Sequence, residues 1–95
     1  MLTPVNEGMA LMRLRENGLS SRQVGDDVVL LDMVNSRYLT VSGSGVLLFA
    51  ELREERTRDE LVTALCGAYD VDADTAGRDV DAFVTQLSNA GLLAA

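Results

Sequence analysis

The apolar pattern of this chain changes its period near Ser42, and that change limits the folds that it can adopt. Before Ser42, short apolar and β-branched runs are separated by turn residues, a pattern typical of strands. After Ser42, apolar residues recur at every third or fourth position until Gly91, a pattern typical of helices. The sequence therefore predicts an α+β fold in which helices cover one face of a sheet.

Three antiparallel strands are expected before the change of period, at residues 19–24, 28–31 and 37–41. Gly25 and the two acids after it supply a hairpin turn between the first two strands. Asn35 and Ser36 supply the turn before the third strand. Residues 1–18 hold the only Pro and are predicted to form a partly flexible N-terminal extension. The domain itself is expected to span residues 19–95.

The third predicted strand alternates in a way that suits a half-buried strand. Leu39 and Val41 are expected to face the core, whereas Tyr38 and Thr40 face the other way. We expect this strand to lie at the edge of the sheet, with unpaired backbone N–H and C=O groups. Such an edge can accept a further strand, either from another peptide or from a second copy of the chain.

Capping signals divide the rest of the chain into three helices. Ser42 is the expected N-cap of the first helix. Thr57 begins a T-x-x-E capping box that opens the second helix. The acidic stretch at residues 72–74 opens the third helix, which is expected to end at Gly91. This order of three strands and three helices resembles a winged helix-turn-helix whose wing comes first.

The chain contains no His, which removes His-based acid/base catalysis, the common catalytic triads and imidazole metal sites. Cys66 falls in the apolar pattern of the second helix, so we expect a buried core thiol. Asp70, Asp72 and Asp74 resemble the start of a calcium loop but lack its later ligands, which favours a solvated helix cap. We therefore expect no catalytic residue, no metal and no cofactor.

The formal charge of −7 disfavours binding to the phosphate backbone of a nucleic acid. No apolar run reaches the roughly 18 residues needed to span a bilayer, and the first residues do not form an export signal. A single Cys supplies no disulfide framework. These features predict a soluble cytoplasmic protein without a membrane or nucleic-acid partner.

The sequence resembles that of PqqD-like domains over roughly residues 19–93. The resemblance is carried by several short segments: Val28-Val29-Leu30-Leu31-Asp32, Arg37-Tyr38-Leu39-Thr40-Val41, Gly45 followed by Leu48-Phe49, Thr57-Arg58-Asp59-Glu60-Leu61, Tyr69-Asp70-Val71, Asp79-Val80 with Phe83 and Leu87, and Gly91-Leu92-Leu93. It is nearest to the stand-alone members of lasso-peptide pathways. In those members a Trp often stands where this chain has Phe49, and an Asn often stands where it has Ser42.

This resemblance implies a domain without catalytic activity that binds the leader segment of a ribosomally synthesised precursor peptide. In the family, the leader lies as an added antiparallel strand on the third strand, in a groove completed by the third helix. The lasso-pathway members present the leader to a separate transglutaminase-like cysteine protease. An asparagine-synthetase-like cyclase then closes the core peptide and is a further expected partner.

Carried over by position, the resemblance implies ten peptide-binding residues. The edge strand contributes Arg37, Tyr38, Leu39, Thr40 and Val41, and the third helix contributes Asp79, Val80, Phe83, Val84 and Leu87. Val84 and Leu87 fit a role in the core equally well, because one apolar stripe serves both the sheet and a ligand. Asp79 flanks this stripe and is placed to hold a polar group of the partner.

A winged-helix DNA-binding or regulatory protein is the alternative function that the order of helices allows. Such a protein needs a basic recognition helix. The third predicted helix offers Arg78 alone against Asp79 and Asp81, so the charge pattern favours the peptide-binding function.

Overall fold

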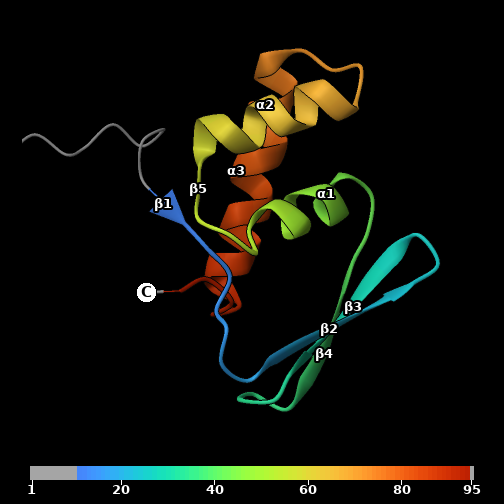
Figure 1. Cartoon of the computed structure of the whole chain (residues 1–95), viewed down its shortest axis with the longest axis vertical. Coiled ribbons are helices and arrows are strands. Elements are labelled where there is room, and N and C mark those ends of the chain that lie inside the picture. The colour runs from blue at the N-terminus through green and yellow to red at the C-terminus, as the bar shows by residue number, and fades with distance from the viewer. Residues whose placement is uncertain (1–10, 95) are drawn as a thin grey trace, which may run out of the picture.

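In the computed structural model, which describes residues 11–94, a three-stranded sheet projects from a group of three helices (Figure 1). The strands of this sheet are β2 (Leu19–Val24), β3 (Asp27–Asp32) and β4 (Arg37–Val41). The helices are α1 (Ser44–Glu51), α2 (Arg58–Ala68) and α3 (Ala73–Asn89). The predicted α+β class is confirmed, with the sheet preceding the helices, although the likeness to a winged helix-turn-helix is only a loose one.

The sheet is antiparallel with the strand order β2-β3-β4, which leaves β4 at one edge. A two-residue turn joins β2 to β3, and Gly25 enters it with a φ of 62° that an L side chain rarely adopts. In the register between β3 and β4, Leu30 lies opposite Leu39 and Val28 lies opposite Val41. All four of these side chains point toward the helices, as period-2 alternation requires.

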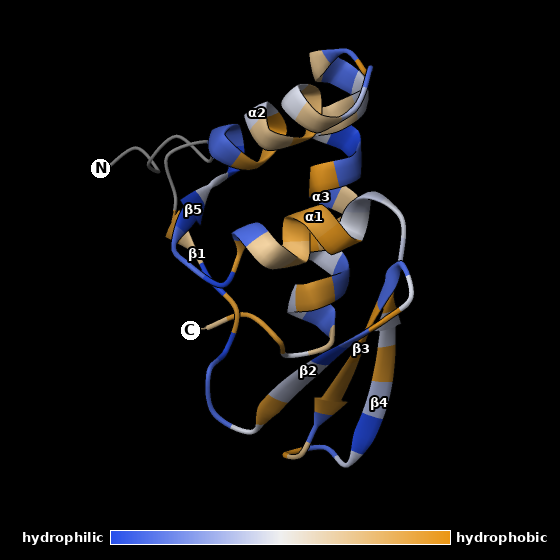
Figure 2. Cartoon of the chain, turned by 45° about the vertical axis from the view of Figure 1, so that its right-hand side comes forward, coloured by the Kyte–Doolittle hydropathy of each residue, from blue (hydrophilic) through white to orange (hydrophobic). Residues whose placement is uncertain are grey.

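The core lies between the inner face of the sheet and the helices. Its largest fully buried side chains come from β3, all three helices and the C-terminal segment: Leu30, Leu48, Leu52, Leu61, Leu65, Val80 and Leu92. Figure 2 shows β3 as the most apolar strand, between the more polar β2 and the alternating β4. Tyr38 and Thr40 are exposed on the outer face of β4, which confirms the predicted alternation of this strand.

Capping hydrogen bonds fix the starts of α2 and α3, and a glycine follows the end of α3. The Thr57 hydroxyl accepts a hydrogen bond from the backbone N–H of Glu60 at 3.1 Å, and the Glu60 carboxylate accepts one from the N–H of Thr57 at 2.8 Å. The Asp72 carboxylate accepts a hydrogen bond from the N–H of Thr75 at 2.7 Å at the start of α3. Gly91, with a φ of 72°, follows the C-cap of α3. The predicted capping box and helix end are both confirmed.

Two local predictions were wrong. Ser42 does not cap α1, because the N-cap position falls on Gly43, which has a φ of 61° and no side chain to accept a hydrogen bond. Cys66 is exposed rather than buried. It follows Leu65, which faces the core, and a step of one residue rotates a side chain by about 100° around a helix toward solvent.

The segment before β2 packs against the domain within the described residues. β1 (Leu11–Met12) pairs with β5 (Arg56–Thr57), and Leu14 is buried and forms a β-bridge with Leu93. Part of the segment predicted as an extension, residues 11–14, thus contacts the rest of the fold, whereas residues 1–10 lie outside the described part. No helix within residues 11–94 is long and apolar enough to cross a membrane.

Candidate functional site

A groove with a volume of about 340 Å³ runs between β4 and α3. Its floor and walls are lined by Leu30, Leu39, Thr40, Val41, Ser42, Ser44, Gly45, Asp79, Ala82, Phe83, Gln86, Leu87, Ala90 and Leu92. Most of these side chains are apolar, and the few polar ones lie on β4, at the start of α1 and along α3. An open apolar groove with a few polar groups is the usual form of a binding site.

The free edge of β4 forms one side of this groove. Val24 faces Asp27 across a two-residue turn, which places the backbone groups of Asp27 toward β2. Because these groups alternate along a strand, those of Leu30 point toward β4, where they meet Leu39. The N–H and C=O groups of Tyr38 and Thr40 therefore point away from the sheet. Within residues 11–94 no other strand pairs with them.

The opposite side of the groove is built around the Phe83 ring. A Cβ placed on Gly45 would lie 3.0 Å from a carbon of that ring and 3.1 Å from a methyl carbon of Val41. The absence of a side chain at Gly45 thus lets α3 approach α1 and β4 closely, and it fixes where the half-buried ring lies. The ring therefore forms an apolar surface directly beside the edge strand.

The structure brings six of the ten predicted site residues together in the groove: Leu39, Thr40, Val41, Asp79, Phe83 and Leu87. The other four lie elsewhere. Val80 is fully buried in the core, and Val84 is half-buried outside the groove. The Tyr38 side chain is exposed on the outer face of the sheet, so only its backbone faces the edge. Arg37 makes polar contacts at one end of the groove.

Ala82, Gln86 and Ala90 also line the groove and were missed by the sequence prediction. Together with Asp79 and Phe83 they form one stripe at the spacing of a helix face. That spacing was visible in the sequence, but the prediction favoured the larger apolar side chains, so it included Val80 and Val84 and left these three residues out. Gly45 was among the residues that carried the family resemblance, but its contact with Phe83 on a distant helix could not be predicted from the sequence.

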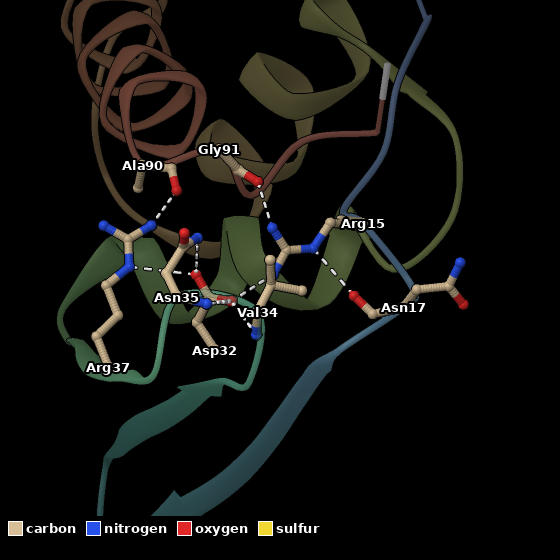
Figure 3. A network of polar contacts seen from close by, with 8 residues as sticks. All are labelled: Arg15, Asn17, Asp32, Val34, Asn35, Arg37, Ala90 and Gly91. Atoms are coloured by element: carbon tan, nitrogen blue, oxygen red, sulfur yellow. Dashed lines mark hydrogen bonds and ion pairs between the residues drawn. The ribbon is translucent and has the colours of Figure 1, made fainter.

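A buried carboxylate ties β4 to the end of α3 (Figure 3). The fully buried Asp32 side chain accepts hydrogen bonds from Arg15 at 2.6 Å, from Arg37 at 3.2 Å and from the Asn35 amide at 2.8 Å. Arg37 also donates to the backbone carbonyl of Ala90, and Arg15 donates to that of Gly91 at 2.7 Å. Two cations thus join the β3–β4 turn to the C-terminal end of α3, where the helix dipole favours positive charge.

This network sets the ionisation of Asp32. Hydrogen bonds from Asn35, Arg15 and Arg37 hold the pKa of the Asp32 carboxyl far below its usual range, against an opposing effect of burial. The carboxylate therefore stays charged at any pH at which the protein is normally handled. Its role in the fold is to hold Arg37, which in turn joins β4 to the end of α3.

The described residues do not group three or more His, Cys, Asp or Glu side chains in a way that could hold a metal ion. The Arg58 guanidinium pairs with Asp81 at 2.7 Å, which joins the start of α2 to α3 outside the groove. This ion pair lowers the pKa of the Asp81 carboxyl. The groove is thus suited to hold a ligand by backbone hydrogen bonds and apolar contact.

Comparison with known proteins assigns this geometry to one family. The family model described as coenzyme PQQ synthesis protein D (PqqD) matches residues 27–93, which include β3, β4 and all three helices. The solved structure of TbiB1 in complex with the TbiA(beta) leader peptide is 31% identical, covers 85% of this chain and 93% of that one, and has a TM-score of 0.77. No curated protein matches the sequence significantly.

A second solved structure, of lasso peptide synthetase B1 complexed with the leader peptide, is 27% identical to this chain. It covers 88% of this chain and 98% of that one, also with a TM-score of 0.77. Both structures therefore match over most of the chain.

Proposed function

This chain belongs to the PqqD family, and from that premise we propose that it is a recognition element that binds the leader segment of a ribosomally synthesised precursor peptide. The observation that carries the proposal is the unpaired edge of β4 beside an apolar groove. Two related proteins of similar fold were solved with a leader peptide bound. The proposed product class is that of the lasso peptides.

The proposed mode of binding is addition of the leader to β4 as an antiparallel strand. The backbone groups of Tyr38 and Thr40 supply hydrogen bonds that any extended peptide can make. Alternate side chains of the leader then point into the groove, where Phe83, Leu87 and Leu39 contact them. Backbone pairing thus provides affinity, and the shape of the groove provides the choice of sequence.

The domain contributes binding and no catalysis in this proposal. It presents the leader to a transglutaminase-like cysteine protease, and then to an asparagine-synthetase-like cyclase, which carry out the chemical steps. The absence of His and the buried, structural state of Asp32 are consistent with such a division of work. Nucleic acid is not a proposed partner, because Arg78 is the only basic residue of α3 and stands beside Asp79 and Asp81.

Amide exchange tests the proposed edge directly. On addition of a leader peptide that binds the protein, we expect slower exchange of the Tyr38 and Thr40 amides. Their neighbours Leu39 and Val41 face β3 and serve as internal controls, because their amides are already paired. Hydrogen exchange followed by NMR resolves the four positions. Binding of the leader without added protection at Tyr38 and Thr40 would contradict strand addition at β4.

Gly45→Ala tests whether the groove depends on the position of Phe83. The added methyl group is expected to displace the ring and weaken leader binding about threefold to tenfold, because the nearest ring carbon would lie at 3.0 Å. Gly67→Ala is the matched control, since a Cβ there, in the last turn of α2, meets nothing within 4 Å. That control should change stability by no more than about 1 kcal/mol and leave affinity unchanged. Equal affinities of the two variants, measured by calorimetry, would argue against the groove.

A further inference from the structure

Asp79 is the only charged side chain among the described residues that line the groove. The other polar side chains of the lining belong to Thr40, Ser42, Ser44 and Gln86, which carry no charge. Asp79 is exposed at its position on α3. A single carboxylate in a neutral groove favours a cationic group in the ligand.

The Asp79 carboxylate has no partner among residues 11–94, unlike two other acids of this region. Asp72 caps α3, and Asp81 forms an ion pair with Arg58. Asp74, which lies outside the groove, is likewise without a side-chain partner among the described residues. The charge of Asp79 therefore does not serve the stability of the described fold, and it is available to a bound peptide.

The fold also places the Asp79 charge at one end of the groove, the end near the last residues of β4. Arg37, at the start of β4, contacts the carbonyl of Ala90 at the end of α3. Near the end of β4, Val41 packs close to Phe83 through the contact with Gly45. Asp79 lies about one helical turn before Phe83, and therefore beyond the end of β4, next to the start of α1.

An antiparallel strand added to β4 starts at the end where β4 finishes. We propose that the groove selects leaders that carry a Lys or Arg on the N-terminal side of their apolar anchor residues, with the cation facing Asp79. This inference rests on the proposed function, because it takes its direction from antiparallel addition to β4. It adds a charge requirement and a polarity that backbone pairing alone does not impose.

Selection from a displayed library of random peptides of about 15 residues tests this inference without a known leader. Three baits are used: the unmodified protein, Asp79→Lys, and Asp70→Lys. Asp70 is exposed, lies between α2 and α3 and does not line the groove. Its variant therefore makes the same change in net charge away from the groove. Sequencing of the retained peptides gives the residue preference at each position relative to the apolar anchors.

The unmodified protein and Asp70→Lys are expected to retain peptides enriched in Lys or Arg before the apolar residues. Asp79→Lys should lose that enrichment and favour Asp or Glu at the same position. The best peptide retained by the unmodified protein should bind Asp79→Lys at least about tenfold more weakly, and Asp79→Asn about threefold to tenfold more weakly. These differences should shrink in 1 M NaCl, where the screening length falls to about 3 Å.

Two different negative results distinguish the charge preference at Asp79 from strand addition at β4. If the retained peptides protect the Tyr38 and Thr40 amides from exchange but show no preference for a cation, the charge inference is wrong and strand addition stands. If no retained peptide protects those amides, strand addition at β4 is wrong, and the charge inference is overturned with it. A preference for cations that survives Asp79→Lys unchanged would also overturn the role of Asp79.

Discussion

Phe83→Asp is expected to weaken leader binding by at least about 100-fold, which corresponds to roughly 2.7 kcal/mol. The ring forms the apolar side of the groove next to β4, and its loss removes the largest contact surface offered to the leader. The new carboxylate also lies one helical turn from Asp79, so that two like charges would face the peptide. Isothermal titration calorimetry with the cognate leader measures the change.

The matched control for this variant is Val84→Asp. Val84 is half-buried like Phe83 and is the next residue of α3, but it does not line the groove. Both variants place a charge against the core, and both should lose about 1–3 kcal/mol of stability in a thermal or urea melt. Only Phe83→Asp should lose affinity once the folded fraction is taken into account. An equal loss of affinity in Val84→Asp would place the binding surface on a different face of α3.

The parts of the fold that depend on neighbouring residues could be predicted from the sequence. The alternation of residues 37–41 placed Leu39 and Tyr38 on opposite faces of β4, and the structure has them there. The Thr57 capping box and the turn at Gly91 were likewise readable, because each needs only a few adjacent residues. Local propensity and tertiary packing agree at these positions, which is typical of natural sequences.

The features that were missed depend on residues that are distant in the sequence. Ser42 has the chemistry of an N-cap, but the chain turns through Gly43 with a positive φ, and tertiary packing moved the helix start by one position. Cys66 belongs to an apolar pattern whose inward face is already filled by Leu61 and Leu65. Hydrophobic periodicity indicates which stripe of a helix is apolar, but it does not indicate how far around the helix the core extends.

The same limit explains the division of the predicted site on α3. Val80 and Phe83 were both selected as apolar groove residues, yet Val80 is completely buried and Phe83 is only half-buried. The boundary between core and groove depends on the distance from α3 to β4. The contacts that hold α3 beside β4 are the packing of Phe83 and Val41 around Gly45 and the bond from Arg37 to the Ala90 carbonyl. They were not predicted because they join separate segments of the chain.

Asp32→Asn is expected to lower the melting temperature by about 10 °C or more at neutral pH. The substitution leaves Arg15 and Arg37 without the anion that holds them, and it places a neutral amide among hydrogen-bond donors in a fully buried site. Hydrogen bonds from Asn35 and the two Arg side chains hold the pKa of the Asp32 carboxyl below its usual range. The unfolded chain therefore binds a proton at Asp32 more readily than the folded protein does, so stability from this group is lost as the pH falls.

The dependence of the melting temperature on pH distinguishes loss of the Asp32 charge from a simple packing defect. In the unmodified protein the contribution of Asp32 is fully present above about pH 5 and declines as the pH falls below about 4, the usual range for Asp in an unfolded chain. The difference between the unmodified protein and Asp32→Asn should therefore narrow toward pH 2. Asp26→Asn, at the exposed β2–β3 turn, is the control and should change the melting temperature little at any pH. A constant difference across the pH range would show that the charge of Asp32 does not stabilise the contacts that join β4 to the end of α3.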